Sequence, residues 1–237
     1  MMELAHSSGH IGPQVTEPSH HPSEDMLLEY ASGSMAEPMA VLIATHLALC
    51  PSCRQQVADL EVLGGQMLEK TEEVEVGDDL LARLMSELDG APEAAGSPSR
   101  SPQTDASTID VDVSVPKPLR DYLPQPLHTL DWKGRGVAQI NLLAERDDYQ
   151  SRLLKIRPET VMPSHTHDGM EATLVLRGAF TDRGQRYARG DVALADGSVD
   201  HSPVAEAGED CICFAVNGGP IRLTGPIGRL FNPFVNL

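Results

Sequence analysis

Residues 91–118 divide the chain into two parts that follow different hydrophobic patterns. This segment is rich in proline, serine, alanine and glycine and has no sustained period, which predicts a flexible linker. Before it, apolar residues recur at helical spacing, and after it short apolar runs alternate with turn residues. At 237 residues the chain has room for a small domain on each side. We therefore expect a disordered tail at residues 1–19, a helical domain at 20–90 and a β domain at 119–237, and we expect the linker to keep the two domains from sharing a core.

Four helices are expected before the linker. The first begins with Ser23 as its N-cap. The second starts where Ser34 and Glu37 have the spacing of a capping box, and the third begins at Pro51. The fourth carries an apolar stripe that packs either on its own bundle or on a protein partner. The stripe consists of Leu80, Leu81, Leu84, Met85 and Leu88.

After the linker, five short apolar runs are separated by turn residues, without a long helical stripe. This rhythm predicts an antiparallel barrel or sandwich. The runs lie at residues 136–143, 152–156, 172–176, 191–195 and 210–216.

The chain is strongly acidic, with a formal net charge of -17 and a pI near 4.8. Direct binding of nucleic acid is not expected, because it requires clustered lysine and arginine. Residues 21–89 carry 14 acidic and 3 basic residues, whereas residues 119–237 carry 15 and 13. An acidic helical region suits a protein partner with a basic surface, such as a DNA-binding protein, although solubility alone is an alternative explanation.

We expect a cytoplasmic protein that does not enter a membrane. The N-terminal residues lack the apolar core of a secretory signal, and the longest apolar run is about half of a membrane span. Four cysteines in that compartment indicate metal ligands or redox thiols rather than disulfides.

Three potential metal ligands are spaced so that they converge: His46, Cys50 and Cys53. Residues four apart share a helix face, and a cysteine three positions later, beyond a helix break, can reach the same point. Tetrahedral zinc needs a fourth ligand. His21 is the leading candidate and His20 its competitor. Either histidine gives a closed His2Cys2 site of the structural kind.

This motif resembles that of the zinc-containing anti-sigma factors, and among them those with a cupin as second domain. The segments "HHPSEDMLLEYASGSM" and "VLIATHLALCPSC" carry the resemblance, which extends over nearly the whole chain except the N-terminal tail and the linker. It implies that His21 completes a zinc site. It also implies a small four-helix domain that binds an extracytoplasmic-function sigma factor.

A second set of ligands follows the linker. Two histidines on an extended segment point to one face, and a glutamate shortly after them can join them. A histidine further along the chain completes a His3Glu set, for which we expect zinc, with iron or manganese as alternatives. These residues are His165, His167, Glu171 and His201.

The His3Glu set resembles the metal-binding pattern of cupins, which implies an antiparallel jelly-roll barrel for residues 119–237. The sequence departs from that pattern at Glu159, where cupins have glycine, and at Asp196 and Ser198, where they have proline and glycine. Such changes are compatible with the fold. They argue against transferring the chemistry of cupin enzymes, so no catalytic residues are expected.

Cys211 and Cys213 alternate on a predicted strand and therefore share one face. They are either small apolar residues lining a barrel or a redox-active pair. The resemblance implies an anti-sigma factor that releases its sigma factor on an oxidative signal such as singlet oxygen, sensed through the cupin. The alternative is a metal-dependent cupin oxygenase or isomerase with an N-terminal assembly domain.

Overall fold

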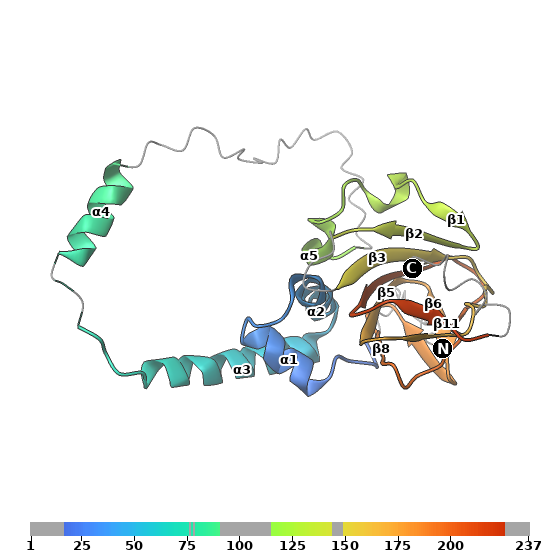
Figure 1. Cartoon of the computed structure of the whole chain (residues 1–237), viewed down its shortest axis with the longest axis horizontal. Coiled ribbons are helices and arrows are strands. Elements are labelled where there is room, and N and C mark those ends of the chain that lie inside the picture. Colours follow the sequence, from blue (N-terminus) through green and yellow to red (C-terminus); the bar gives the residue numbers. More distant parts are fainter. Residues whose placement is uncertain (1–16, 76, 78, 91–114, 144–148, 226–237) are drawn as a thin grey trace, which may run out of the picture. The chain divides into compact units, whose positions relative to one another are not determined.

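The computed structural model describes residues 17–75, 77, 79–90, 115–143 and 149–225, so most of the predicted tail and linker lie outside the described residues. As predicted, a helical region precedes an antiparallel β domain (Figure 1). The helices are α1 (Glu24–Ala31), α2 (Glu37–Leu49), α3 (Pro51–Glu69), α4 (Leu80–Gly90) and α5 (Lys117–Arg120), with a short 3-10 segment at Leu127–Thr129. The strands are β1 (Lys133–Arg135), β2 (Val137–Asn141), β3 (Gln150–Ile156), β4 (His165–His167), β5 (Glu171–Arg177), β6 (Ala179–Asp182), β7 (Gln185–Ala188), β8 (Val192–Ala195), β9 (Val204–Ala205), β10 (Cys211–Asn217) and β11 (Ile221–Leu223).

Local capping explains where α1 begins but not where α2 begins. Ser23 caps α1 as predicted, since its hydroxyl accepts a hydrogen bond from the Met26 amide at 3.3 Å. The predicted capping box at Ser34 does not form. Because α2 begins at Glu37 itself, its N-cap is Ala36, which has no side-chain oxygen to offer.

The five predicted apolar runs all become strands of one sheet. Its order is β1-β2-β3-β10-β5-β8, and every neighbouring pair is antiparallel. Two smaller sheets, β7-β6-β9 and β11-β4, complete the barrel. The central strand β10 pairs with β3 and β5, so that Phe214 lies opposite Leu153 on one side and Leu174 on the other.

The two faces of the large sheet contribute to two different apolar clusters. The outer face joins the helices in the larger cluster, and the inner face lines the barrel in the smaller one. All seven residues of β10 are buried because both faces of this strand are covered. The outer face includes Leu153, Leu174, Leu176, Phe214 and Val216, and the inner cluster includes Ile156, Val175, Phe180, Tyr187, Cys211 and Cys213.

The prediction that the helices and the β domain do not share a core is wrong. Leu42 and Ile43 of α2 belong to the same buried cluster as Leu174 and Phe214 of the sheet. α2 is apolar around most of its circumference, and such a helix is stable only when several sides are covered. α5 and strands β5 and β10 provide this cover (Figure 1). The described residues up to Glu61 therefore form one compact unit with those from 115 onward, and residues 62–90 belong to a second unit.

We expect the substitution Leu42→Ala to destabilise the helices and the barrel together. Leu42 is fully buried in the shared core, so its truncation should lower the free energy of unfolding by about 3 kcal/mol. Far-ultraviolet circular dichroism follows the helices, and fluorescence of Trp132, the single tryptophan, follows the β domain. The unfolding transitions followed by circular dichroism and by fluorescence should shift by the same amount.

Leu28→Ala is the matched control, because Leu28 is 52% exposed on α1 and its truncation should cost little. Two separate transitions, of which Leu42→Ala shifts only the helical one, would contradict the shared core.

Candidate metal centres

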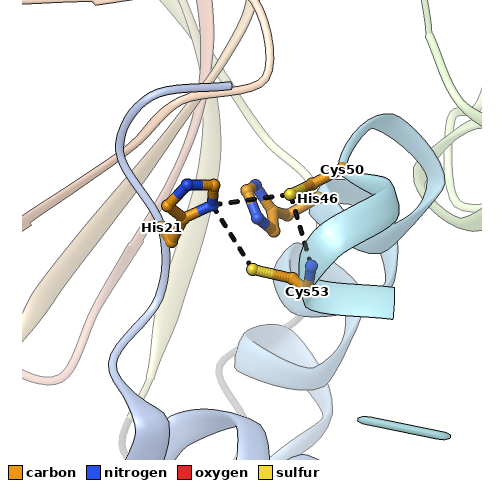
Figure 2. A group of neighbouring side chains, drawn as sticks. All are labelled: His21, His46, Cys50 and Cys53. Carbon is orange, nitrogen blue, oxygen red and sulfur yellow. Dashed lines mark hydrogen bonds between the residues drawn. The ribbon is translucent and has the colours of Figure 1, made fainter. Parts of the chain in front are cut away.

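The first ligand cluster lies where α2 ends and α3 begins (Figure 2). His46 occupies the last turn of α2, and Cys53 lies in the first turn of α3. Between them Cys50 is the C-cap of α2 in an extended conformation, with φ −116° and ψ 103°. This break aims both sulfurs at His21, and the ligand atoms of all four residues lie within 4.8 Å of one another.

The donor atoms of this cluster are prepared for a cation. His21 Nδ1 lies 3.4 Å from both cysteine sulfurs. Burial and the neighbouring Cys50 raise the pKa of the Cys53 thiol to about 12, so a thiolate at Cys53 requires a positive charge beside it. Burial lowers the pKa of His46, which keeps the imidazole neutral. Its buried Nε2 has no hydrogen-bond partner among the described residues, as expected of an atom reserved for a metal.

His20, the alternative fourth ligand, is turned toward the β domain. Its ring lies 4.3 Å from that of Tyr187, and its Nδ1 is 3.6 Å from an Asp191 carboxylate oxygen. The structure therefore brings His21, and not His20, into the cluster.

The segment before α1 is fastened to the turn between β7 and β8, and we call residues 18–20 with 188–192 the clasp. The Asp191 carboxylate accepts hydrogen bonds from the amides of Ser19 at 2.6 Å, His20 at 3.0 Å and Ala188 at 2.7 Å. Although burial alone would raise the pKa of Asp191, these bonds hold it below its usual value. In return, the Val192 amide donates to the His20 carbonyl at 3.0 Å.

The clasp also reaches a metal ligand. His46 Nδ1 lies 2.7 Å from the carbonyl oxygen of Gly190, which can only accept, so Nδ1 carries the proton. This tautomer leaves the Nε2 lone pair facing the cysteines. A backbone oxygen of the barrel thus orients a ligand of the helical centre.

The second cluster lies inside the barrel. β4 places His165 and His167, β5 begins with Glu171, and an isolated bridge pairs His201 with His165. All four residues are buried, and their ligand atoms lie within 4.8 Å of one another.

As at His46, hydrogen bonds on the far side of the ring fix the orientation of two histidines in this cluster. His165 donates from Nδ1 to the Pro163 carbonyl at 2.7 Å, and His201 from Nδ1 to Asp182 at 2.9 Å. Each bond leaves Nε2 free for a metal. Burial would raise the pKa of Glu171, but bonds from His167 at 2.9 Å and Asn217 at 3.1 Å hold it low. The carboxylate is therefore ionised, and the donor set fits a divalent ion.

Comparison with known proteins places the chain in a family. Residues 125–221 match the family described as the ChrR Cupin-like domain. Over 220 residues the chain is 37% identical to the Anti-sigma-E factor ChrR of Cereibacter sphaeroides, covering 92% of this chain and 98% of that one. The chain belongs to the ChrR family of anti-sigma factors.

A solved structure agrees with this assignment. The crystal structure of Rhodobacter sphaeroides SigE in complex with the anti-sigma ChrR matches with a TM-score of 0.69 and 36% identity. The match covers 84% of this chain and 98% of the other. The predicted resemblance and the cupin fold of this ChrR-family protein are thereby confirmed. No helix in the described parts of the chain has the length and apolar character needed to cross a membrane.

The cupin pattern explains an unusual backbone conformation. Glu159 has φ 60°, in the left-handed region, at the position where the pattern has glycine. This conformation costs a non-glycine residue about 1 kcal/mol. The turn at Glu159 therefore keeps its left-handed conformation in this ChrR-family protein, although glycine would adopt it at lower cost.

Cys211 and Cys213 share one inward face of β10, as predicted. Both are 1% exposed, and their sulfurs are 3.6 Å apart. Cys213 also lines a small inner cavity beside Glu171 and His201. Its bond to Cys211 and its burial raise the pKa of Cys213 well above the usual value, so the Cys213 thiol is protonated.

The apolar stripe of α4 is exposed. Its five predicted side chains range from 37% exposure at Leu80 to 70% at Leu81 and Leu88. The second half of α3 carries further exposed apolar side chains, distributed around much of the helix. They are Val62, Leu63, Met67 and Leu68, which are 53% to 75% exposed.

Sequence reasoning also missed the residues that orient the ligands. Asp182 and Asn217 lie on strands that are distant in the sequence from the ligands they contact. The sequence around Gly190 and Asp191 indicates only a turn after a strand. Nothing local indicates that this turn meets His46, which is 144 residues away in sequence.

We expect Gly190→Ala to weaken metal binding at the N-terminal cluster by about tenfold, the lower end for loss of an outer hydrogen bond. Gly190 has φ +91°, and a Cβ there would lie 2.7 Å from Cγ of Pro18, so Pro18 and the turn at Gly190 must move apart. Chelator competition with the purified full chain measures this affinity.

Gly184→Ala is the matched control. Gly184 has a similar φ of +79° but no atom within 4 Å of the added Cβ, so it suffers the same backbone strain without touching the clasp. Equal metal affinity in the two variants would show that the clasp does not support the centre.

Proposed function

We propose that this ChrR-family protein binds and inhibits an extracytoplasmic-function sigma factor in the cytoplasm and releases it on an oxidative signal such as singlet oxygen. The observation that carries the proposal is the match to ChrR in complex with SigE, which spans nearly the whole of that ChrR chain. Metal-supported helices would hold the sigma factor, and the cupin would sense the signal.

The apolar stripe of α4, together with the exposed apolar side chains of α3, is the proposed partner-binding surface. Contiguous exposed apolar side chains are characteristic of protein interaction sites. An amphipathic helix such as α4 commonly lies in an apolar groove of its partner. Residues 21–89 have a net charge of -11, which favours a partner with a basic surface. The proposed contacts on α4 are Leu80, Leu81, Leu84, Met85 and Leu88.

We propose zinc at the N-terminal cluster, where two thiolates and two imidazoles match its tetrahedral preference and leave no open position. Such an ion would link the segment before α1 to both α2 and α3. At the cupin cluster we propose a divalent ion, with zinc preferred over iron or manganese.

The clasp is the proposed route from the cupin to the anti-sigma helices. Tyr187 packs in the inner barrel cluster with Cys211 and Cys213, and its ring contacts His20 at 4.3 Å. Oxidation of these thiols or of a cupin ligand would change the packing around Tyr187. That change would reach residue 20, beside the ligand His21, through direct contacts. In this proposal the oxidative signal shifts the clasp between two states, and both metal centres contribute to the balance between them.

Leu84→Asp should weaken sigma-factor binding by at least about tenfold, because it places a charge in the apolar contact. Binding is measured between the full chain and the sigma factor that co-purifies with it from the native host. Ser86→Asp adds the same charge off the apolar stripe of α4 and should have little effect. Equal binding by the two variants would remove α4 from the interface.

His167→Ala should retain inhibition but lose the response to singlet oxygen, because the cupin centre can no longer change state. A reporter driven by the sigma factor should stay off in this variant and switch on in the wild type. His128→Ala is the control, since His128 is an exposed histidine outside both clusters. Normal induction in His167→Ala, at matched protein levels, would reject the cupin as the sensor.

A further inference from the structure

Arg152 is a buried cation inside the barrel that the metal cluster does not use. It lies on β3, is 4% exposed, and donates to Gln150 at 2.9 Å. Its Nε has no hydrogen-bond partner among the described residues. A guanidinium remains charged in proteins, and a buried charge is normally paired. Burial lowers the pKa of Arg152 and the charge of Glu171 raises it, so Glu171 balances the guanidinium in part. Within the part of the chain that the structure describes, no second carboxylate is paired with Arg152, which leaves capacity for a further anion.

This side chain lines a cavity of about 510 Å³, within the size range of small-molecule sites. The cavity also reaches the metal cluster, because His165 and Glu171 form part of its wall. The remaining wall is largely apolar and includes Val137, Leu154, Val161, Met162 and Ile221.

The two buried carboxylates at the metal cluster also accept hydrogen bonds from other side chains. The two oxygens of Glu171 accept from His167 and Asn217. Asp182 accepts from His201 and lies 3.5 Å from the guanidinium of Arg183. A divalent ion in the cluster together with Arg152 would exceed the charge of these two carboxylates. The cavity is thus electrostatically prepared for an anion.

We infer that the barrel of this protein binds a small organic carboxylate, anchored by the Arg152 guanidinium. The planar fork of arginine matches the two oxygens of a carboxylate, and the apolar wall favours a hydrocarbon chain over a hydrated inorganic anion. This site is independent of the proposed sigma-factor binding and would hold whether or not the cupin senses oxidants.

Isothermal titration calorimetry of the zinc-loaded full chain tests the inference. The probes are short linear mono- and dicarboxylates, from acetate to suberate, with inorganic phosphate as the comparison. At least one carboxylate should bind more tightly than phosphate. Arg152→Gln should weaken its binding by about tenfold or more, the effect of losing a charge-assisted hydrogen bond.

Lys133→Gln is the matched control, since Lys133 is an exposed cation on the wall of the same cavity. It should change the affinity much less than Arg152→Gln does. Arg152→Lys keeps the positive charge but removes the planar guanidinium. Its carboxylate affinity serves as the test if circular dichroism shows that Arg152→Gln does not fold. The inference is overturned if no carboxylate binds the wild type, if phosphate binds more tightly, or if the folded Arg152 variant binds as the wild type does.

Discussion

The packing of one apolar helix against the outer face of a β-sheet determines how the rest of this protein is arranged. α2 has almost no polar side, so it needs cover from α5 and from strands β5 and β10. Its last turn carries His46 and therefore brings the N-terminal ligand cluster to the surface of the barrel. The position of that cluster beside the β7–β8 turn is thus a consequence of burying Leu42 and Ile43.

Both candidate metal sites rely on the same hydrogen-bonding arrangement. In each, a histidine donates a hydrogen bond from Nδ1–H to a fixed oxygen, which leaves the Nε2 lone pair directed toward the other ligands. Within the barrel the oxygens belong to Pro163 and Asp182, and for His46 the oxygen belongs to Gly190. Since that last acceptor comes from the barrel, the geometry of the helical centre depends on a part of the chain that provides none of its ligands.

Patterns within a few residues could be predicted from the sequence, and contacts between distant segments could not. The long apolar strands, such as β10, were evident, whereas β4 and β6 have only 3 and 4 residues with mixed polarity. The spacing of His46, Cys50 and Cys53 encodes their convergence locally. The contacts of Asp191 with Ser19 and His20 have no such local signal. The Ser34 capping box does not form because α2 begins only at Glu37, and the Ser34 hydroxyl instead contacts Ser32 and the Glu29 carbonyl at the end of α1.

The separation in sequence across the clasp has a consequence for how the protein is made. Ser19 and Asp191 are 172 residues apart, and β8 follows directly after Asp191. A ribosome releases the chain from its N-terminus, so the helices emerge long before their partner turn does. A nascent or prematurely terminated chain that ends before Gly190 lacks the oxygen that orients His46. Full assembly of the N-terminal ligand cluster is therefore delayed until most of the β domain has been synthesised.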